Sequence, residues 1–561
     1  MPTARERELG MHFVHIEFRG IQHFLFAVPR LRAMVGANAL VGDMLRHRLP
    51  QLAQRCGTAA PPPPDGKFPS TKVDHDPLFA EDKPQDDLDK GIISRDGGHF
   101  EALFPADASD FVKEVSKLIA DRLPGLGFDI RVIPAHLPDL GFIRVDGEKA
   151  SKAEARDLVD LPHFQVCEFS GRGPAFGRIG SKDEQPWASF EAATRIASGE
   201  RFATYQRTGR KAYDTVSLLQ PHLALADLAA PQDFKDLCDR DYLAVVFADG
   251  NNVGGGKPQP KNLRERLEEQ AFYRAARAAN RAAVQAAIAS AVDTWKRTSI
   301  KQDFRFRPYQ LLMLGGDDFL MACRAPMALP FLVAYARELK KYSMPDGRHL
   351  TIGAGVAIAR PNVPFYRLHE IAETLAQSAK RKHRGLPENE RKIVSIADWA
   401  VFTASWAGDP IAARAKEVLR YVNGRKLVLS GRPLPLLGSG LDSVEGLLEA
   451  AERIDQDVRD GNAARSQLRT LCQDLSRGMM SGMASFAALP SETRDVLKDQ
   501  KLDGAWQLCG NGKNEKWVMS RIPDLVEVFE IWRLGRRKST QAAGSSKASP
   551  NAPATAQGGQ S

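Results

Sequence analysis

The sequence predicts an α+β fold in which two similar units precede a mainly helical region. Three observations support this prediction: apolar runs that alternate like strands and end in glycine, hairpin-like runs centred on Gly-Gly pairs, and a second appearance of the same order of elements. The 561 residues are enough for two to four domains, and a hydrophobic content of 43% is ample for buried cores. A formal net charge of +9 is compatible with a polyanionic partner but does not require one.

The first unit begins with Met11–Gly20, which alternates like a strand. A helical pattern with a break at Pro29 follows, and then a stretch rich in proline and charge that we expect to be a mobile surface insertion. The rest of the unit has the outline of a hairpin that turns at Gly97 and Gly98, a helix and a closing strand. From the first helical stretch onward, these elements occupy residues 21–53, 57–90, 91–105, 107–123 and 127–135.

The second unit repeats this order with a strand, a long Ala- and Arg-rich helix, a hairpin that turns at Gly315 and Gly316, a helix, a closing strand and a further helix. These elements occupy residues 241–250, 261–298, 308–323, 329–342, 349–359 and 369–384. The repeated order indicates a duplication, although two coincidentally similar α/β halves would give the same pattern. For the basic stretch Arg264–Arg281 we expect a solvated helix face in preference to an RNA contact.

Three aspartates point to a metal site. Asp317 and Asp318 leave the second hairpin turn between the apolar runs LLML and FLMAC, and Asp249 ends an equally apolar strand. If strand and hairpin are neighbours, the three carboxylates converge, and their repulsion and desolvation require a stabilising partner. Mg²⁺ prefers such oxygen ligands, and two ions about 3.5–4 Å apart can stabilise an in-line displacement at phosphorus. The alternative is an ordinary Gly-Gly-Asp turn with solvated carboxylates.

Small and basic residues near these carboxylates are candidates for nucleotide contacts: Gly250, Asn251, Asn252, Gly315, Gly316 and Lys380. The run DGNNVGGG offers backbone N–H groups to a triphosphate, as glycine-rich turns that enter a helix do, but it is also an ordinary turn composition. Glycines in the hairpin turn have no side chain to block an approaching nucleotide. Lys380 could reach the phosphates from the last helix, or it could belong to a solvated basic helix end.

Cysteine usage and the N-terminus indicate a cytoplasmic protein. The six cysteines form no C-x-x-C pair, which argues against a zinc ribbon or a dithiol redox motif and fits a reducing compartment. The charged start MPTARERELG has no apolar core of a signal peptide, and no stretch approaches the roughly 18 apolar residues that span a bilayer. We therefore expect no membrane association.

Four groups of residues, taken together, match one protein family: HIEFRGIQHFLF with LRAMVGANAL, GGHFEALFP, FADGNNVG with LGGDDFLMAC, and LTIGAGVAIA with PFYRLHEIAETLAQSAK. In this order they resemble the opening strand and helix, the carboxylate-free first hairpin, the first strand and active hairpin of the second palm, and its closing strand and helix. The family is the large palm-domain subunit of type III CRISPR effector complexes, a cyclic-oligoadenylate synthase. The resemblance spans about residues 11–400.

The resemblance implies two ferredoxin-like palm domains, the second of the nucleotidyl cyclase (GGDEF) type, followed by a helical C-terminal domain. It divides the chain into a degenerate first palm without carboxylates in its hairpin, an irregular linker with a zinc-knuckle remnant, a second palm with the Gly-Gly-Asp-Asp site, the helical domain, and a tail whose composition predicts disorder. These segments are residues 11–160, 161–239, 240–400, 401–535 and 536–561.

The resemblance also implies a reaction in antiviral defence. The 3′-hydroxyl of one ATP attacks the α-phosphate of another, pyrophosphate leaves, and the product is cyclised as a second messenger. Asp249, Asp317 and Asp318 would be the catalytic ligands of Mg²⁺ or Mn²⁺, and Asn251, Asn252 and Lys380 would hold the triphosphate. The implied partners are ATP, RNA and other effector subunits.

Two other functions remain as alternatives. One is a non-catalytic, RNA-binding scaffold subunit of an effector complex, although a scaffold has no need of three clustered carboxylates. The other is a template-directed polymerase, since polymerases also use Gly-Asp-Asp hairpins. Two features argue against the polymerase. The active palm is paired with a first palm that has no carboxylates in its hairpin, and no fingers region is evident.

Departures from the family pattern limit what the resemblance implies. The first palm starts near the N-terminus, so we expect no HD nuclease domain, and we interpret His75–Asp76 as a solvated loop. The linker keeps Cys167 but has Ser170 where a second cysteine is expected, so we predict no structural zinc. Gly353 stands where a serine is common, which leaves the contacts to the base open.

Overall fold

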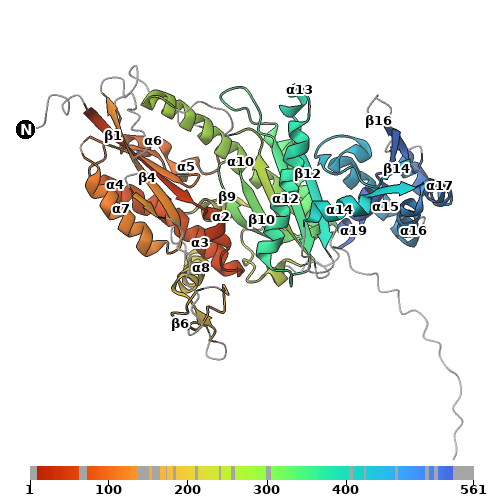
Figure 1. Cartoon of the computed structure of the whole chain (residues 1–561), viewed down its shortest axis with the longest axis horizontal. Coiled ribbons are helices and arrows are strands. Elements are labelled where there is room, and N and C mark those ends of the chain that lie inside the picture. Colours follow the sequence, from red (N-terminus) through yellow and green to blue (C-terminus); the bar gives the residue numbers. More distant parts are fainter. Residues whose placement is uncertain are drawn as a thin grey trace, which may run out of the picture.

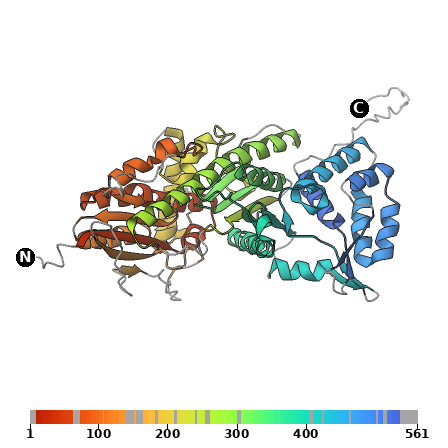
Figure 2. The same ribbon diagram turned by 90° about the horizontal axis from the view of Figure 1, so that it is seen from above.

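The computed structural model shows an elongated molecule whose parts follow one another from the N-terminus to the C-terminus (Figure 1; Figure 2). Figure 1 shows the N-terminal part in red and orange at one end, the C-terminal part in blue at the other, and a green part between them. The structure describes residues 9–61, 73–105, 107–136, 151–153, 164–171, 173–180, 185–208, 213–238, 242–253, 260–298, 305–402, 409–422, 425–461, 465–499, 504–510 and 516–534. The predicted tail 536–561 lies outside the described residues, as do Gly254–Gly256 and parts of the predicted insertion and linker.

The N-terminal unit, the first palm, is built on a sheet with the strand order β2-β3-β1-β4-β5. Its strands are β1 (Leu9–Arg19), β2 (Ile92–Ser94), β3 (His99–Phe104), β4 (Gly127–His136) and β5 (Ser151–Ala153). The central strand β1 pairs antiparallel with both β3 and β4, so Val14 lies opposite Ala102 on one side and Val132 on the other.

Alternate residues of β1 belong to two different cores. Val14 and Ile16 pack with helices of the first palm, namely α2 (Ile21–Phe26), α3 (Leu31–Asp43), α4 (Leu49–Arg55) and α7 (Ser109–Arg122). Met11 and Phe13 point to the other face and pack against Leu263, which begins helix α10 (Leu263–Thr298). Helix α10 follows the first strand of the second unit, so it ties the two units together (Figure 2).

The second palm is built on a sheet with the strand order β15-β12-β11-β8-β10-β9. Its strands are β8 (Leu243–Gly250), β9 (Tyr309–Leu314), β10 (Phe319–Arg324), β11 (Ile352–Ala359), β12 (Ile396–Phe402) and β15 (Leu434–Pro435). On β8, Val246 and Ala248 pack with α10 and α11 (Ala328–Leu339) on one face. Val245 and Phe247 point to the opposite face, which packs with α12 (Phe365–Arg384) and with α2 and α3 of the first palm.

The two palms share one topology. In each sheet the two hairpin strands come first, then the opening strand, then the closing strand: β2-β3-β1-β4 in the first palm and β9-β10-β8-β11 in the second. A helical crossover joins the opening strand to the hairpin, and a second helix, α7 or α11, joins the hairpin to the closing strand. This is the βαββαβ order of a ferredoxin-like domain, and the predicted α+β fold class is confirmed.

The segment between the palms packs on the first palm through close helix contacts. Helix α8 (Phe190–Thr208) lies against α3, where Gly36 and Gly199 face each other's helices. A Cβ at Gly36 would lie 1.9 Å from the carbonyl oxygen of Arg195, and one at Gly199 would lie 2.2 Å from that of Arg32. Both positions therefore need glycine for close approach.

Two expectations about solvated charges are wrong. Residues 73–90 of the predicted insertion include α5 (Phe79–Asp82) and α6 (Pro84–Asp89), and they pack on α10. The Arg281 guanidinium contacts Asp76 at 3.1 Å and also pairs with Asp82, and His75 stacks on Tyr342. Arg281 is only 1% exposed, so this part of the basic helix is a buried ionic interface and His75–Asp76 is not a solvated loop. The partners lie about 200 residues apart, which no local sequence pattern reveals.

The C-terminal part is largely helical, as predicted, but it also holds a small sheet. Its longer helices are α14 (Pro410–Val418), α15 (Val444–Asp460), α16 (Arg465–Arg477), α17 (Met479–Ala487), α18 (Ser491–Asp499) and α19 (Ile522–Leu534). The sheet has the order β13-β14-β17-β16, with β13 (Leu419–Val422), β14 (Arg425–Val428), β16 (Gln507–Gly510) and β17 (Lys516–Met519). Strands of four residues are too short for an alternating pattern to stand out. In the part of the chain that the structure describes, no helix combines the length and apolarity needed to cross a membrane.

Candidate active site

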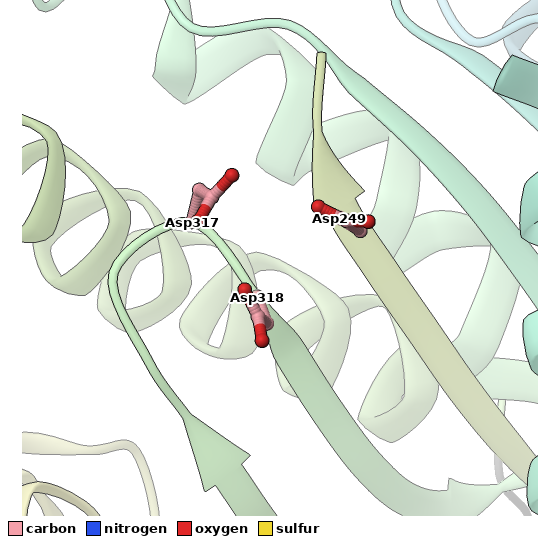
Figure 3. A group of neighbouring side chains, drawn as sticks. All are labelled: Asp249, Asp317 and Asp318. Atoms are coloured by element: carbon pink, nitrogen blue, oxygen red, sulfur yellow. The ribbon is translucent and has the colours of Figure 1, made fainter. Parts of the chain in front are cut away.

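Strand register brings the three predicted carboxylates together. Asp249 is the last residue but one of β8, and Phe319 at the start of β10 lies opposite Ala248. The next pair along these antiparallel strands is therefore Asp249 and Asp318. Figure 3 shows Asp317 beside them on the turn that precedes β10, with all three carboxylates around one gap.

The cluster projects from the sheet face that packs with α12 and the first palm. Phe247, two residues before Asp249, and Leu320, two residues after Asp318, both pack on this side. One oxygen of each of the three aspartates lies within 4.8 Å of the others. Among the described residues, this is the one group of three or more His, Cys, Asp or Glu side chains spaced to share a metal ion.

Burial and mutual repulsion disfavour the ionised cluster. Burial, followed by the negative charges of Asp317 and Asp249, raises the pKa of Asp318 to about 7. Burial, followed by the charge of Asp249, also raises the pKa of Asp317. A divalent cation would offset this penalty, because an opposite charge a few Å away favours the ionised form. An all-carboxylate donor set suits Mg²⁺ or Mn²⁺, so the residues present fit such an ion.

Lys380 reaches the cluster from α12, as the sequence suggested that it could. Its Nζ lies 2.5 Å from Oδ2 of Asp249 and donates a hydrogen bond to the Gly250 carbonyl at 2.9 Å. The side chain crosses Gly353 of β11, where an added Cβ would lie 2.5 Å from Lys380 Cγ. Gly353 therefore leaves the space through which the lysine approaches Asp249, and the solvated helix end is not the environment of this side chain.

The asparagines directly follow β8, and Asn251 is hydrogen-bonded to Thr351. The backbone N–H of Asn251 donates to the Thr351 carbonyl at 2.7 Å, and its side-chain amide contacts the Thr351 hydroxyl at 3.1 Å. Asn252 has a positive φ of 58°. Helix α10 begins only at Leu263, so these residues do not stand at its N-terminus as the glycine-rich pattern suggested. Contact with a triphosphate stays a prediction for both asparagines and for Gly250.

A cavity of about 540 Å³ adjoins the carboxylates. One wall is the turn of the second palm, Gly315 to Asp318, and the other includes the first palm's turn at Gly97 and Gly98. Its size falls in the usual range for small-molecule sites. The two hairpin turns of the two palms thus face one another across a space where a ligand of nucleotide size fits.

Sequence analysis missed two buried polar residues behind the Gly-Gly-Asp-Asp turn. The side-chain amide of Asn280 in α10 donates to the carbonyl oxygens of Gly316 and Asp318, each at 3.4 Å. The hydroxyl of Tyr335 in α11 donates to Oδ1 of Asn280 at 2.6 Å. Asn280 lies in the stretch AARAANRAAVQAA, whose alanines are also interrupted by Arg277, Arg281 and Gln285, so the sequence signal is weak.

The fold and this site define a palm-type domain, in which a ferredoxin-like sheet presents carboxylates beside a hairpin turn. Residues 242–386 match the family model described as "Cas10/Cmr2, second palm domain". This part of the chain is therefore similar to a Cas10/Cmr2 second palm, which confirms the resemblance indicated by the sequence motifs. No curated protein matches the sequence significantly.

Solved structures of low similarity include three of Csm1–Csm4 assemblies. The Csm1–Csm4 cassette in complex with cA4 matches at 11% identity and a TM-score of 0.40, covering 94% of this chain and 70% of that chain. The cassette in complex with one ATP matches at 12% identity and a TM-score of 0.38, with coverages of 95% and 70%. The subcomplex of the type III-A CRISPR-Csm interference complex matches at 13% identity and 0.36, with 88% and 70%. At such low identity and TM-score, they add nothing to the argument on function.

Proposed function

We propose that the protein is a metal-dependent nucleotidyltransferase that makes cyclic oligoadenylate-type second messengers from ATP in CRISPR-type antiviral defence. One observation carries the proposal: three carboxylates of a Cas10/Cmr2 palm converge beside a cavity of nucleotide size. Two strands and a turn must be in register for this to happen, and the resulting repulsion serves no structural purpose. RNA and other effector subunits are the proposed partners.

Asp249, Asp317 and Asp318 would hold Mg²⁺ or Mn²⁺. Bound there, the ions would stabilise the attacking 3′-oxygen and the leaving pyrophosphate oxygen in an in-line displacement at the α-phosphate. Lys380 supplies a positive charge on a flexible side chain, which can move from Asp249 to the triphosphate once the cation neutralises Asp249. The cavity between the palms would hold a nucleotide beside the carboxylates, so positioning and electrostatics would do most of the work.

The geometry disfavours the two alternatives. Burial opposes the ionisation of the three carboxylates, as the raised pKa of Asp318 indicates. A scaffold would gain nothing from such a cluster. A template-directed polymerase needs room for a paired template, whereas the site opens into a cavity bounded by the turn of the first palm. Adenine specificity rests on the family resemblance alone, because Gly353 lies beneath Lys380 and has no side chain to contact a base.

The test is turnover of radiolabelled ATP with Mn²⁺, with and without RNA and partner subunits. We expect cyclic products from the native chain, and none from the double variant Asp317→Ala/Asp318→Ala. The matched control is Glu388→Ala/Glu390→Ala, which removes two exposed carboxylates of the short helix α13 (Glu388–Arg391) and should leave turnover unchanged. Chains whose synthesis requires a template would instead show a polymerase. An absence of turnover under every condition, with all partners present, would support the scaffold.

A further inference from the structure

The turn that carries Asp317 and Asp318 is anchored from behind by Asn280 of α10. Asn280 is fully buried, and its amide nitrogen donates to the carbonyl oxygens of Gly316 and Asp318. These two carbonyls flank Asp317, so one side chain fixes the backbone on both sides of that residue. At 3.4 Å each contact is long, but together they use both N–H groups of the amide.

The orientation of the Asn280 amide follows from its surroundings. Its nitrogen end faces two carbonyl acceptors, and its oxygen end receives the Tyr335 hydroxyl proton at 2.6 Å. The reversed amide would place Oδ1 against both carbonyl oxygens, which repel it. Tyr335 is itself held by its ring, which lies against Phe319 and Phe331 with centroids 5.8 and 5.6 Å away. Phe319 directly follows Asp318, so the tyrosine supports both the amide and the start of β10.

The same helix also contacts the opposite turn. One turn of helix before Asn280, the Arg277 guanidinium lies 3.7 Å from the Asp96 carboxylate, which immediately precedes Gly97 and Gly98. Arg277 and Asn280 therefore connect the two hairpin turns that face each other across the cavity. Helix α10 is long and packed on both palms, so it is a rigid base against which the turn of the second palm can be set.

We propose that Asn280, oriented by Tyr335, is a positioning residue that holds the Gly-Gly-Asp-Asp turn in the shape that binds divalent cations. This inference rests on the proposed function. Within the turn, the Gly315 N–H donates to the Asp318 carbonyl at 3.0 Å, which closes the turn but leaves the Gly316 carbonyl to Asn280. The two glycines and the repulsion of the carboxylates from each other and from Asp249 oppose a fixed arrangement of ligand oxygens. Groups that orient metal ligands without touching the metal commonly change metal affinity about 10–100-fold when removed.

The experiment measures the Mn²⁺ concentration that gives half-maximal product formation, together with Mn²⁺ binding by calorimetry, in the full chain. Asn280→Leu has a similar volume and removes both donors, and we expect the half-saturating Mn²⁺ concentration to rise about 10-fold. Tyr335→Phe keeps the ring and removes the hydroxyl, and we expect a rise of about 3-fold, less than the range of about 10–100-fold, because Tyr335 acts on the turn only through Asn280. Damage that merely lowers the folded fraction would reduce the maximal rate and leave the half-saturation point in place.

The matched control is Tyr309→Phe. Tyr309 is a buried tyrosine on β9 of the same hairpin, and its hydroxyl donates to the Ala224 carbonyl at 2.5 Å, away from the turn. Its removal should not move the Mn²⁺ half-saturation point. If the native chain binds no Mn²⁺, the proposed function itself fails. If the native chain binds Mn²⁺ and Tyr335→Phe leaves the half-saturation point unchanged, the positioning role is overturned, whether or not Asn280→Leu folds.

Discussion

The two hairpin turns occupy the same place in two sheets of the same topology, yet their glycine pairs serve different purposes. Gly97 and Gly98 have φ values of 67° and 80°, which side chains rarely adopt. Gly315 and Gly316 are not among the described residues with positive φ, and a Cβ at Gly316 would meet no atom within 4 Å. Backbone conformation therefore requires glycine in the turn of the first palm, whereas no feature of the fold requires it in the turn of the second. We propose that glycine leaves space there for a ligand.

Acidic residues also differ between the two turns. The prediction that the first hairpin lacks carboxylates is wrong as stated, because Asp96 precedes its glycines and Glu101 lies on β3. Both acids have basic partners: Arg46 and Arg277 for Asp96, and Arg266 for Glu101. Burial would raise the pKa of Asp96, but these arginines hold it well below its usual range.

The acids of the second palm's site have, among the described residues, one basic partner. Lys380 is the basic side chain that reaches the three aspartates, and it pairs with Asp249. Paired acids stabilise a fold, whereas acids in excess of their partners indicate a cation site. The two palms therefore differ in how acids near equivalent turns are used: those of the first palm are paired within the fold, and we propose that those of the second bind cations.

The largest expected effect separates these two uses. Asp318→Asn removes a proposed metal ligand and should lower turnover about 100-fold or more, with little change in stability, since even groups behind the ligands change metal sites about 10–100-fold. Asp96→Asn removes the carboxylate charge that faces Arg277 and Arg46, of which Arg46 also pairs with Asp82, and should cost about 3 kcal/mol of unfolding free energy. Turnover per folded molecule and denaturant melts measure the two effects. A large stability loss in Asp318→Asn with normal Mn²⁺ half-saturation would reverse the assignment.

The next effect concerns the core that joins the palms. His369 of α12 is buried against Phe26 of the first palm and against Phe247 and Phe365 of the second. Burial lowers the pKa of His369 to about 4, with Glu370 opposing this shift. The unfolded chain therefore binds the proton more readily between about pH 6.5 and 4, and unfolding becomes easier as the pH falls through this range.

We expect the free energy of unfolding to drop by about 2–3 kcal/mol between pH 6.5 and 4 on account of this histidine. His369→Leu should remove that part of the pH dependence and leave the rest. Denaturant melts of both chains at several pH values give the difference directly, and the same core should make the two palms unfold together. Parallel pH curves for the native chain and the variant would show that His369 is protonated without penalty and that the interface is looser than described.

Much of this arrangement could be predicted from sequence because it depends on local periodicity. The strand that ends at Asp249 and the hairpin that carries Asp317 and Asp318 are strongly apolar, so the elements stood out, and neighbouring strands bring their ends together. Gly353 illustrates the limit: its residue type is visible in the sequence, but the space that it leaves for Lys380 depends on how α12 crosses the sheet.

Contacts between distant segments could not be predicted. Asn280 looks like any polar residue in an alanine-rich helix until Tyr335 and the turn are placed around it. Arg281 resembles a solvated charge because its partners Asp76 and Asp82 lie far away in the sequence and in a stretch rich in proline. Burial of such polar groups is decided by tertiary pairing, which single-sequence patterns do not contain.

The smallest effect tests the glycine comparison itself. Gly98→Ala forces a side chain into a φ of 80° and sets its Cβ 2.4 Å from Cδ1 of Ile21, so we expect a loss of about 1–2 kcal/mol in stability. Gly316→Ala meets no neighbour and should change stability by less than about 0.5 kcal/mol. If a nucleotide lies over the second turn, however, the added methyl group should raise the KM for ATP several-fold while the melting temperature stays constant. An unchanged KM for ATP in Gly316→Ala would mean that the nucleotide does not approach this backbone. Space for a nucleotide would then not explain the glycines, even if the carboxylates bind metal ions.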